Sequence, residues 1–206
     1  EMARLAKRAA DEGGVRLMVH IGDRDAGDGP TLTRELLPLM ETGDIITHLF
    51  SGNPGRILDD QGEVIPEIMD AQERGVFFDT AHGRMNFNFD VAKRALDQGV
   101  RPQSISTDLT IPGREGVVHS MTAMLTKFLA LGFSLEDVIR MATVNPAGAL
   151  DMADYLGSLA VGRGADITVL EEVAGDWVLS DADGGTIGCD RALVPVVTIK
   201  GGEVFS

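Results

Sequence analysis

The 206-residue sequence is short of the features that mark several classes of protein. It has one cysteine, Cys189, which excludes an internal disulfide and a cysteine-based zinc site and suits a reducing, cytoplasmic compartment. Its 18 lysines and arginines stand against 32 aspartates and glutamates, and the net charge of −14 argues against binding to nucleic acid or to an anionic membrane surface. No uninterrupted apolar run approaches the roughly 20 residues that a membrane span needs. What remains is a globular composition, 44% hydrophobic and 24% charged.

Four successive units of the chain share one plan, a short apolar strand followed by a loop and a helix. The predicted strands lie at 15–19, 44–47, 75–80 and 104–109, and the helices that follow them lie at about 31–41, 65–74, 89–98 and 121–129. The strands are apolar throughout, which indicates a parallel sheet covered on both faces. A doubly wound open sheet has the same period. Half of a β/α barrel is favoured because three of the four strands carry a metal-capable side chain at the same end.

The two ends of the chain differ from this repeat. A helix opens the chain and is expected to end at Gly13-Gly14. From Gly157 the composition changes to short strands at 165–170, 177–179, 194–199 and 203–205, with a tight hairpin turn over Lys200-Gly-Gly-Glu203. These patterns predict two parts: residues 1–155 as half of a barrel, and residues 156–206 as a portion of a small β-sandwich.

Three of the predicted strands end in side chains that can bind a metal ion. His20 follows the first strand, His48 follows the second, and Asp108 lies near the end of the fourth. Because the carboxyl ends of parallel strands meet at one rim, these side chains are expected to converge. Two imidazoles and a carboxylate are a ligand set for Zn²⁺ or a similar divalent ion, with positions left for water. The ion would lower the pKa of that water towards about 7, and Asp108 would act as general base and then general acid.

Four further residues on loops at the same end are candidates for substrate binding. His82, just past the third strand, is predicted to donate a hydrogen bond to the scissile carbonyl, with a metal ligand or an ordinary loop histidine as the alternatives. Arg56 and Arg84 are candidates to pair with a substrate carboxylate, and Asn53 is a further polar candidate.

An ordered series of short motifs carries a family resemblance. The runs are Met18-Val-His-Ile-Gly22, Thr47-His-Leu-Phe50, Asp79-Thr-Ala-His-Gly83, Ser106-Thr-Asp-Leu109, Ala142-Thr-Val-Asn-Pro-Ala147 and Gly157-Ser-Leu-Ala-Val-Gly-Arg-Gly-Ala-Asp166. Together they resemble the amidohydrolase superfamily, and within it the dihydroorotase-like amidohydrolase/deacetylase metallohydrolases. The series covers essentially the whole chain and is specific as a set, whereas no single run would be.

The resemblance implies a fold and a metal centre. The family fold is a (β/α)₈ TIM barrel with a β-sandwich, of which this chain would supply strands 5–8, the C-terminal half, and part of the sandwich. The complete site would hold two metal ions, usually zinc. His20 and His48 would match the histidines after strands five and six, on the more exposed metal. Asp108 would match the aspartate after strand eight, on the more buried metal, where it moves the proton.

One departure from the family pattern bears on the partners of this chain. The family's His-x-His pair and carboxylated lysine have no counterpart here, because the sequence holds no His-x-His and Lys7 lies on the opening helix. The N-terminal half of the barrel is therefore expected from the same protein or from a partner chain. Unpaired strand edges predict homo-oligomerisation, and the chain alone is expected to bind at most one metal ion, weakly.

The function expected from the residues and the resemblance is metal-dependent hydrolysis of an amide or cyclic amide bond, or of an ester. Removal of the acyl group from an N-acyl amino acid or related acylated acid, a small-molecule substrate, is an example. Two alternatives stay open. One is a non-catalytic half-barrel that serves assembly or ligand binding, and the other is a phosphoester or lactone hydrolase on the same scaffold.

Overall fold

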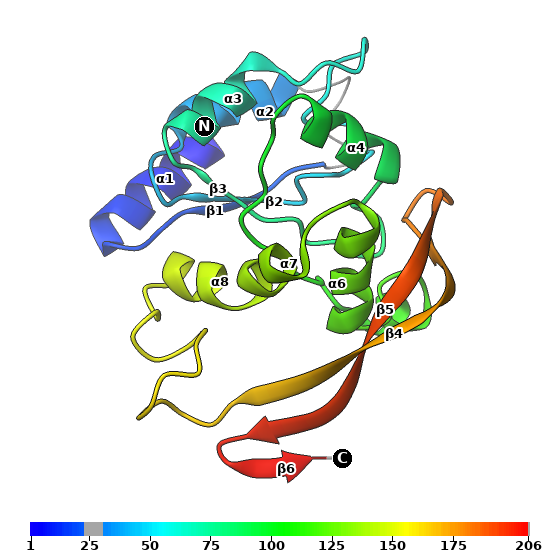
Figure 1. Cartoon of the computed structure of the whole chain (residues 1–206). Coiled ribbons are helices and arrows are strands. Elements are labelled where there is room, and N and C mark those ends of the chain that lie inside the picture. Colours follow the sequence, from blue (N-terminus) through cyan, green and yellow to red (C-terminus); the bar gives the residue numbers. More distant parts are fainter. Residues whose placement is uncertain (23–30, 206) are drawn as a thin grey trace.

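The first part of the molecule is a short parallel sheet with helices packed around it (Figure 1). The computed structural model describes residues 1–22 and 31–205. Strands β1 (Met18–His20), β2 (Ile45–Thr47) and β3 (Phe77–Phe78) pair in parallel and in chain order. The order in a doubly wound sheet reverses at a switch point. The unbroken order of these three strands is consistent with an arc of a β/α barrel, and each half of a doubly wound sheet shares it.

Helices alternate with these strands, largely where the sequence predicts them. The bounds are α1 (Met2–Gly13), α2 (Thr31–Leu36), the 3₁₀ helix η1 (Leu37–Leu39), α3 (Pro66–Glu73), α4 (Phe89–Asp97), α5 (Ile111–Glu115), α6 (Met121–Ala130), α7 (Leu135–Ala142) and α8 (Val144–Ala149). Gly14 ends α1 in the left-handed conformation, with φ of 63°. Pro38 shortens the predicted helix 31–41 by turning its second half into η1. No helix in residues 1–22 and 31–205 has the length and apolar character needed to cross a membrane.

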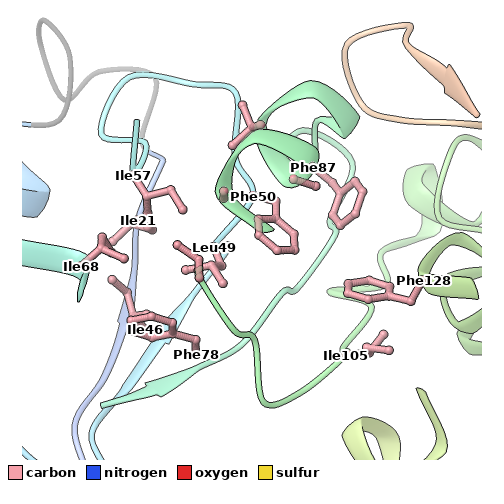
Figure 2. Packing of buried hydrophobic residues seen from close by; sticks show 14 of the residues in the cluster. Ile21, Ile46, Leu49, Phe50, Ile57, Ile68, Phe78, Phe87, Ile105 and Phe128 are labelled. Carbon is pink, nitrogen blue, oxygen red and sulfur yellow. The ribbon is translucent and has the colours of Figure 1, made fainter. Parts of the chain in front are cut away.

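The hydrophobic core lies between the parallel strands and the helices (Figure 2). Ile46 and Phe78 come from β2 and β3, and Phe50 and Phe87 come from the segments just beyond those strands. The Phe87 ring lies 5.9 Å from Phe50 and 5.9 Å from Phe128 of α6, centroid to centroid. Burying each side chain of this size stabilises the folded state by about 1.5–3 kcal/mol. The aromatic cluster therefore ties α6 to the segments that follow the strand ends.

The fourth predicted strand, at 104–109, is not a regular strand in the structure. Its pairing with β3 and the residues after it consists of one parallel bridge, Asp79 with Ser104, and a few backbone hydrogen bonds such as His82 N–H to Ser106 O at 3.2 Å. The prediction of a strand here was wrong because residues 104–107 pair with the irregular segment 79–83. The hydroxyl groups of Ser104 and Ser106 also turn onto the Asp79 carboxylate.

The C-terminal part is an antiparallel sheet of β4 (Ile167–Ser180), β5 (Thr186–Lys200) and β6 (Glu203–Phe205). The predicted strand 203–205 is confirmed as β6, whereas the predicted strands 165–170 and 177–179 are joined in β4, and the predicted strand 194–199 is the end of the longer β5. The reason is that the breaks are absorbed as bulges: the register shifts at Ala174/Trp177 and again near Pro195, where a missing N–H is tolerated. The predicted hairpin turn is confirmed, since Lys200 pairs with Glu203 across two glycines of positive φ.

The long β4–β5 ribbon crosses the lower face of the molecule and reaches α4 with its tip (Figure 1). Its middle packs on α6, where the Leu193 N–H donates to the Thr126 hydroxyl at 3.1 Å. At the tip, the Ala182 N–H donates to Phe87 O, and the Asp181 carboxylate accepts the Phe89 N–H, each at 2.9 Å. The ribbon is therefore fixed to the segment that enters α4.

Candidate active site

The structure brings the three predicted metal ligands to one end of the parallel sheet. His20 ends β1 and His48 directly follows β2, with ring centroids 4.3 Å apart and ring planes at 73°. His48 Nε2 lies 4.0 Å from Asp108 Oδ2. His48 and Asp108 both have positive φ, 68° and 45°, a conformation that costs a non-glycine residue about 1–2 kcal/mol. Such strain is kept where the surroundings fix the backbone, as they often do at functional sites.

His48 is held in the tautomer that a metal ligand needs. Its Nδ1 lies 2.7 Å from the Ala81 carbonyl oxygen, so Nδ1–H donates to that oxygen and Nε2 keeps its lone pair on the side of Asp108. Burial lowers the pKa of His48, and the neighbouring His20 lowers it further, against the raising effect of the Ala81 carbonyl and the Asp108 carboxylate. The side chain is therefore neutral at pH 7, which is the form that coordinates a metal.

The donor set fits a divalent ion in chemistry, while the spacing is wider than that of a closed site. Within residues 1–22 and 31–205, no group of three or more His, Cys, Asp or Glu side chains is placed closely enough to hold one ion. Two ligand atoms on a tetrahedral zinc, with bonds of about 2.0–2.2 Å, lie about 3.4 Å apart. The 4.0 Å between His48 and Asp108 is only slightly longer, and the Asp108 side chain is 48% exposed. A small movement of this one carboxylate would close the gap.

A buried carboxylate, Asp79, joins the ends of three chain segments next to this site. It accepts hydrogen bonds from the hydroxyl groups of Thr47 at 2.6 Å, Ser104 at 2.5 Å and Ser106 at 2.8 Å. It also accepts a hydrogen bond from the backbone N–H of Ala81 at 3.2 Å, and the carbonyl oxygen of the same Ala81 orients the His48 ring. Asp79 thus supports the residue that positions a proposed ligand. Sequence reasoning missed this role, although a carboxylate ending an apolar strand was a signal for it.

His82 lies in the core beside the site. Its side chain is fully buried and its ring stacks on Phe87, with centroids 4.6 Å apart. Nδ1 is 2.6 Å from Gly83 O and Nε2 is 2.9 Å from Lys127 Nζ, so both ring nitrogens are engaged within the protein. Burial, and then the charge of Lys127, lower the pKa of His82 to about 4. The predicted role as hydrogen-bond donor to substrate stays a prediction, and this geometry gives His82 a structural partner instead.

The polar loop residues predicted to bind substrate differ in how far they are engaged. The Asn53 amide donates to Met85 O at 2.8 Å, and so ties the loop after β2 to the loop after β3. Arg56 bonds within its own loop, to Leu58 O at 3.2 Å and to Asp60 at 3.4 Å. Arg84 is exposed on the loop that starts at Gly83. These contacts engage Asn53 and Arg56 within the protein and leave Arg84 the most accessible of the three, and substrate binding by all three stays a prediction.

Two buried charged groups near His82 were not identified from the sequence. Lys127 of α6 is 1% exposed, and its ammonium donates to His82 Nε2 and, at 2.6 Å, to Val117 O. Burial lowers the pKa of Lys127 to about 8, against the raising effect of the Asp181 carboxylate. Lys127 sits among the apolar residues of its helix, and that position was the one available signal. Asp181 comes from the tip of the β4–β5 ribbon, which only the tertiary structure brings here.

Comparison with known proteins assigns the chain to a family. Residues 65–204 match the amidohydrolase family, and the chain therefore belongs to that family, as its motifs predicted. A deacetylase of Enterococcus faecalis (strain ATCC 700802 / V583) is 36% identical over 204 residues, which are 98% of this chain and 54% of the deacetylase.

Two solved structures are also similar to this chain. The crystal structure of an adenine deaminase matches with a TM-score of 0.90 and 35% identity, over 98% of this chain and 54% of the other. The crystal structure of a dihydroorotase matches with a TM-score of 0.84 and 31% identity, over 98% of this chain and 52% of the other. The chain thus spans about half the length of the relatives it matches, which is consistent with a partial barrel.

Proposed function

We propose that this chain supplies the C-terminal half, strands 5–8, of the barrel of a metal-dependent hydrolase of C–N bonds. The observation that carries the proposal is that His20 and His48 adjoin at the ends of β1 and β2, with Asp108 4.0 Å from His48 and with His48 already oriented by Ala81. Coverage of about half of each relative supports a further half-barrel from the same protein or a partner chain. So does β1, which pairs only with β2 among the described residues and exposes Met18.

The residues present account for the binding and proton-transfer parts of such a reaction. His20, His48 and Asp108 would hold the metal, with zinc as the ion that suits imidazole and carboxylate ligands. A bound divalent ion would polarise the scissile carbonyl and lower the pKa of a water molecule. Asp108, half exposed at the rim, can accept a proton from the attacking water and deliver it to the leaving nitrogen as the C–N bond breaks.

The substrate class we propose is a small acylated acid, such as an N-acyl amino acid, or a cyclic amide or ester of similar size. Support comes from the deacetylase that is 36% identical over nearly the whole chain. Arg84 is exposed one residue after Gly83, whose backbone lies against the Asp108 carboxylate. A guanidinium there suits pairing with the carboxylate of such a substrate.

Asp108→Asn tests the proposal in a protein that carries the complete barrel. The amide side chain tolerates the positive φ of this position and keeps the size of the carboxylate, but it cannot act as a base. We expect turnover of the best acyl-amide substrate to fall by about 10²–10⁴-fold, the usual contribution of general acid–base catalysis. Asp151→Asn is the matched control, because Asp151 is also an exposed aspartate of positive φ, at 55°.

The outcomes separate the competing functions. Unchanged turnover by Asp108→Asn, with folding intact, would overturn the mechanism. Hydrolysis restricted to phosphoesters or lactones in a substrate panel would replace the substrate class. A complete barrel that neither binds zinc nor turns over any member of the panel would support a non-catalytic half-barrel.

A further inference from the structure

One short loop, residues 81–83, lies between the two side chains that approach each other at the rim. At one end, the Ala81 carbonyl accepts the hydrogen bond from His48 Nδ1 at 2.7 Å. At the other end, Gly83 comes so close to Asp108 that an added Cβ would lie 2.5 Å from Oδ2. The position of this loop therefore sets the orientation of His48 and the space available to the Asp108 carboxylate.

The middle residue of the loop is anchored from inside the protein. The His82 ring stacks on Phe87 at an interplanar angle of 7°, and its Nε2 accepts a hydrogen bond from Lys127 Nζ at 2.9 Å. Its Nδ1–H bonds Gly83 O at 2.6 Å, which stiffens the loop itself. Lys127 belongs to α6, and it is fixed in turn by its bond to Val117 O at 2.6 Å. A continuous chain of contacts thus runs from α6 through His82 to the rim.

The buried ammonium of Lys127 destabilises the core in which it lies. Within residues 1–22 and 31–205, Lys127 makes no ion pair, and Asp181 acts on it only through longer-range attraction. An unpaired charge inside a protein costs several kcal/mol of desolvation, which an apolar side chain of the same length would avoid. Apart from Thr126, the other buried residues of α6 are apolar, namely Met124, Leu125, Phe128 and Leu129, so an apolar residue would suit this position.

We propose that Lys127 and His82 are positioning residues for the active site: the Lys127 ammonium, acting through the His82 ring, fixes loop 81–83 so that its two ends place His48 and Asp108. This inference rests on the proposed function only in naming His48 and Asp108 as the groups that matter. The hydrogen-bond relay itself is defined by the contacts above. It can therefore be tested without measuring turnover.

The test reads the tautomers of the histidine rings by long-range ¹H–¹⁵N spectroscopy of the ¹⁵N-histidine-labelled 206-residue chain, which contains four histidines. In the unmodified chain, His48 and His82 should both carry the proton on Nδ1. Lys127→Met removes the donor to His82 and should loosen loop 81–83. We expect the ratio of the Nδ1–H to the Nε2–H tautomer of His48 to fall at least about fivefold, the equilibrium change of one ordinary hydrogen bond.

Thr126→Val is the matched control, because Thr126 neighbours Lys127 on α6, is equally buried and loses hydrogen bonds to Thr122 O and the Leu193 N–H. It should leave the signals of His48 unchanged. Equal spectra of His48 in Lys127→Met and the unmodified chain, or equal changes in both variants, would overturn the proposal. If Lys127→Met does not fold, the unmodified chain decides alone, since a proton on His82 Nε2 would be incompatible with the relay. Unchanged turnover by Asp108→Asn would overturn the proposed function and would leave this result untouched.

Discussion

Gly83 offers a sharp test of the site, because one methyl group there should separate folding from function. Gly83 has φ of 54°, and a Cβ on it would lie 2.5 Å from Asp108 Oδ2, whereas ordinary contacts are 3.4–4 Å. Gly83→Ala therefore forces the carboxylate to retreat by about 1 Å, the difference between those distances. The retreat is easy for the fold, because the Asp108 side chain is 48% exposed and can rotate.

The expected magnitudes follow from this geometry. Placing alanine in the left-handed conformation costs about 1–2 kcal/mol of stability. Gly14→Ala is the matched control, because Gly14 has φ of 63° and an added Cβ there has no neighbour within 4 Å. Both variants should lose similar stability, within about 0.5 kcal/mol. A misplacement of about 1 Å at a reacting group can cost about 10²-fold in rate, so only Gly83→Ala should lose activity.

Two assays check this prediction. Urea denaturation of both variants measures the free energy of unfolding, and hydrolysis of the best acyl-amide substrate by a complete barrel measures turnover. Equal turnover by Gly83→Ala and Gly14→Ala would refute the placement of Asp108 as the proton-transferring group. A much larger stability loss for Gly83→Ala would show that the Asp108 carboxylate is held more rigidly than its exposure implies.

Two further predictions concern stability. Asp44 is buried and accepts hydrogen bonds from the N–H groups of Leu17 and Glu41, each at 2.9 Å. Asp44→Ala should therefore lower the free energy of unfolding, measured by urea denaturation, by about 2–4 kcal/mol, whereas Asp70→Ala, at an exposed position, should lower it by less than about 0.5 kcal/mol. Equal losses in the two variants would contradict this prediction. Because the pKa of His82 is lowered from 6.5 to about 4 in the fold, the unfolded chain binds its proton first as the pH falls. Stability should thus drop by up to about 3 kcal/mol between pH 6.5 and 4, and an equal drop in His82→Phe would exclude His82 as the cause.

The position of side chains at the rim could be predicted from the sequence, because it depends only on where each strand ends. Parallel strands place their carboxyl ends at one edge, so residues that end apolar runs must meet there. His20 and His48 follow this rule at the ends of β1 and β2. Asp108 comes from an irregular segment, and its carboxylate lies 4.0 Å from His48 Nε2. Their role as metal ligands stays a proposal. The hairpin turn at Lys200–Glu203 was equally local, since two adjacent glycines allow the positive φ values that the turn requires.

The residues that surround the rim and bond to it could not be predicted from the sequence in the same way. Hydrophobic periodicity indicates which side of an element is buried, but not which polar partner a buried side chain will meet. His82 bonds to Lys127, 45 residues away, and its burial and this contact could not be predicted from the residues around it in the chain. Asp79 gathers hydroxyl groups from two other segments for the same reason. No regular strand forms at 104–109, because the Ser106 hydroxyl bonds to the Asp79 carboxylate and Ser104 makes only an isolated bridge with Asp79.

By itself, the sequence determined the parallel βα plan, the family and the choice of His20, His48 and Asp108 as candidates, because each depends on local pattern or on motif order. The tertiary structure alone decided how those side chains are held: the tautomer of His48, the space beside Asp108, and the buried link from α6 to the loop between them. These depend on contacts between residues far apart in the chain, which only the packed core brings within hydrogen-bonding distance.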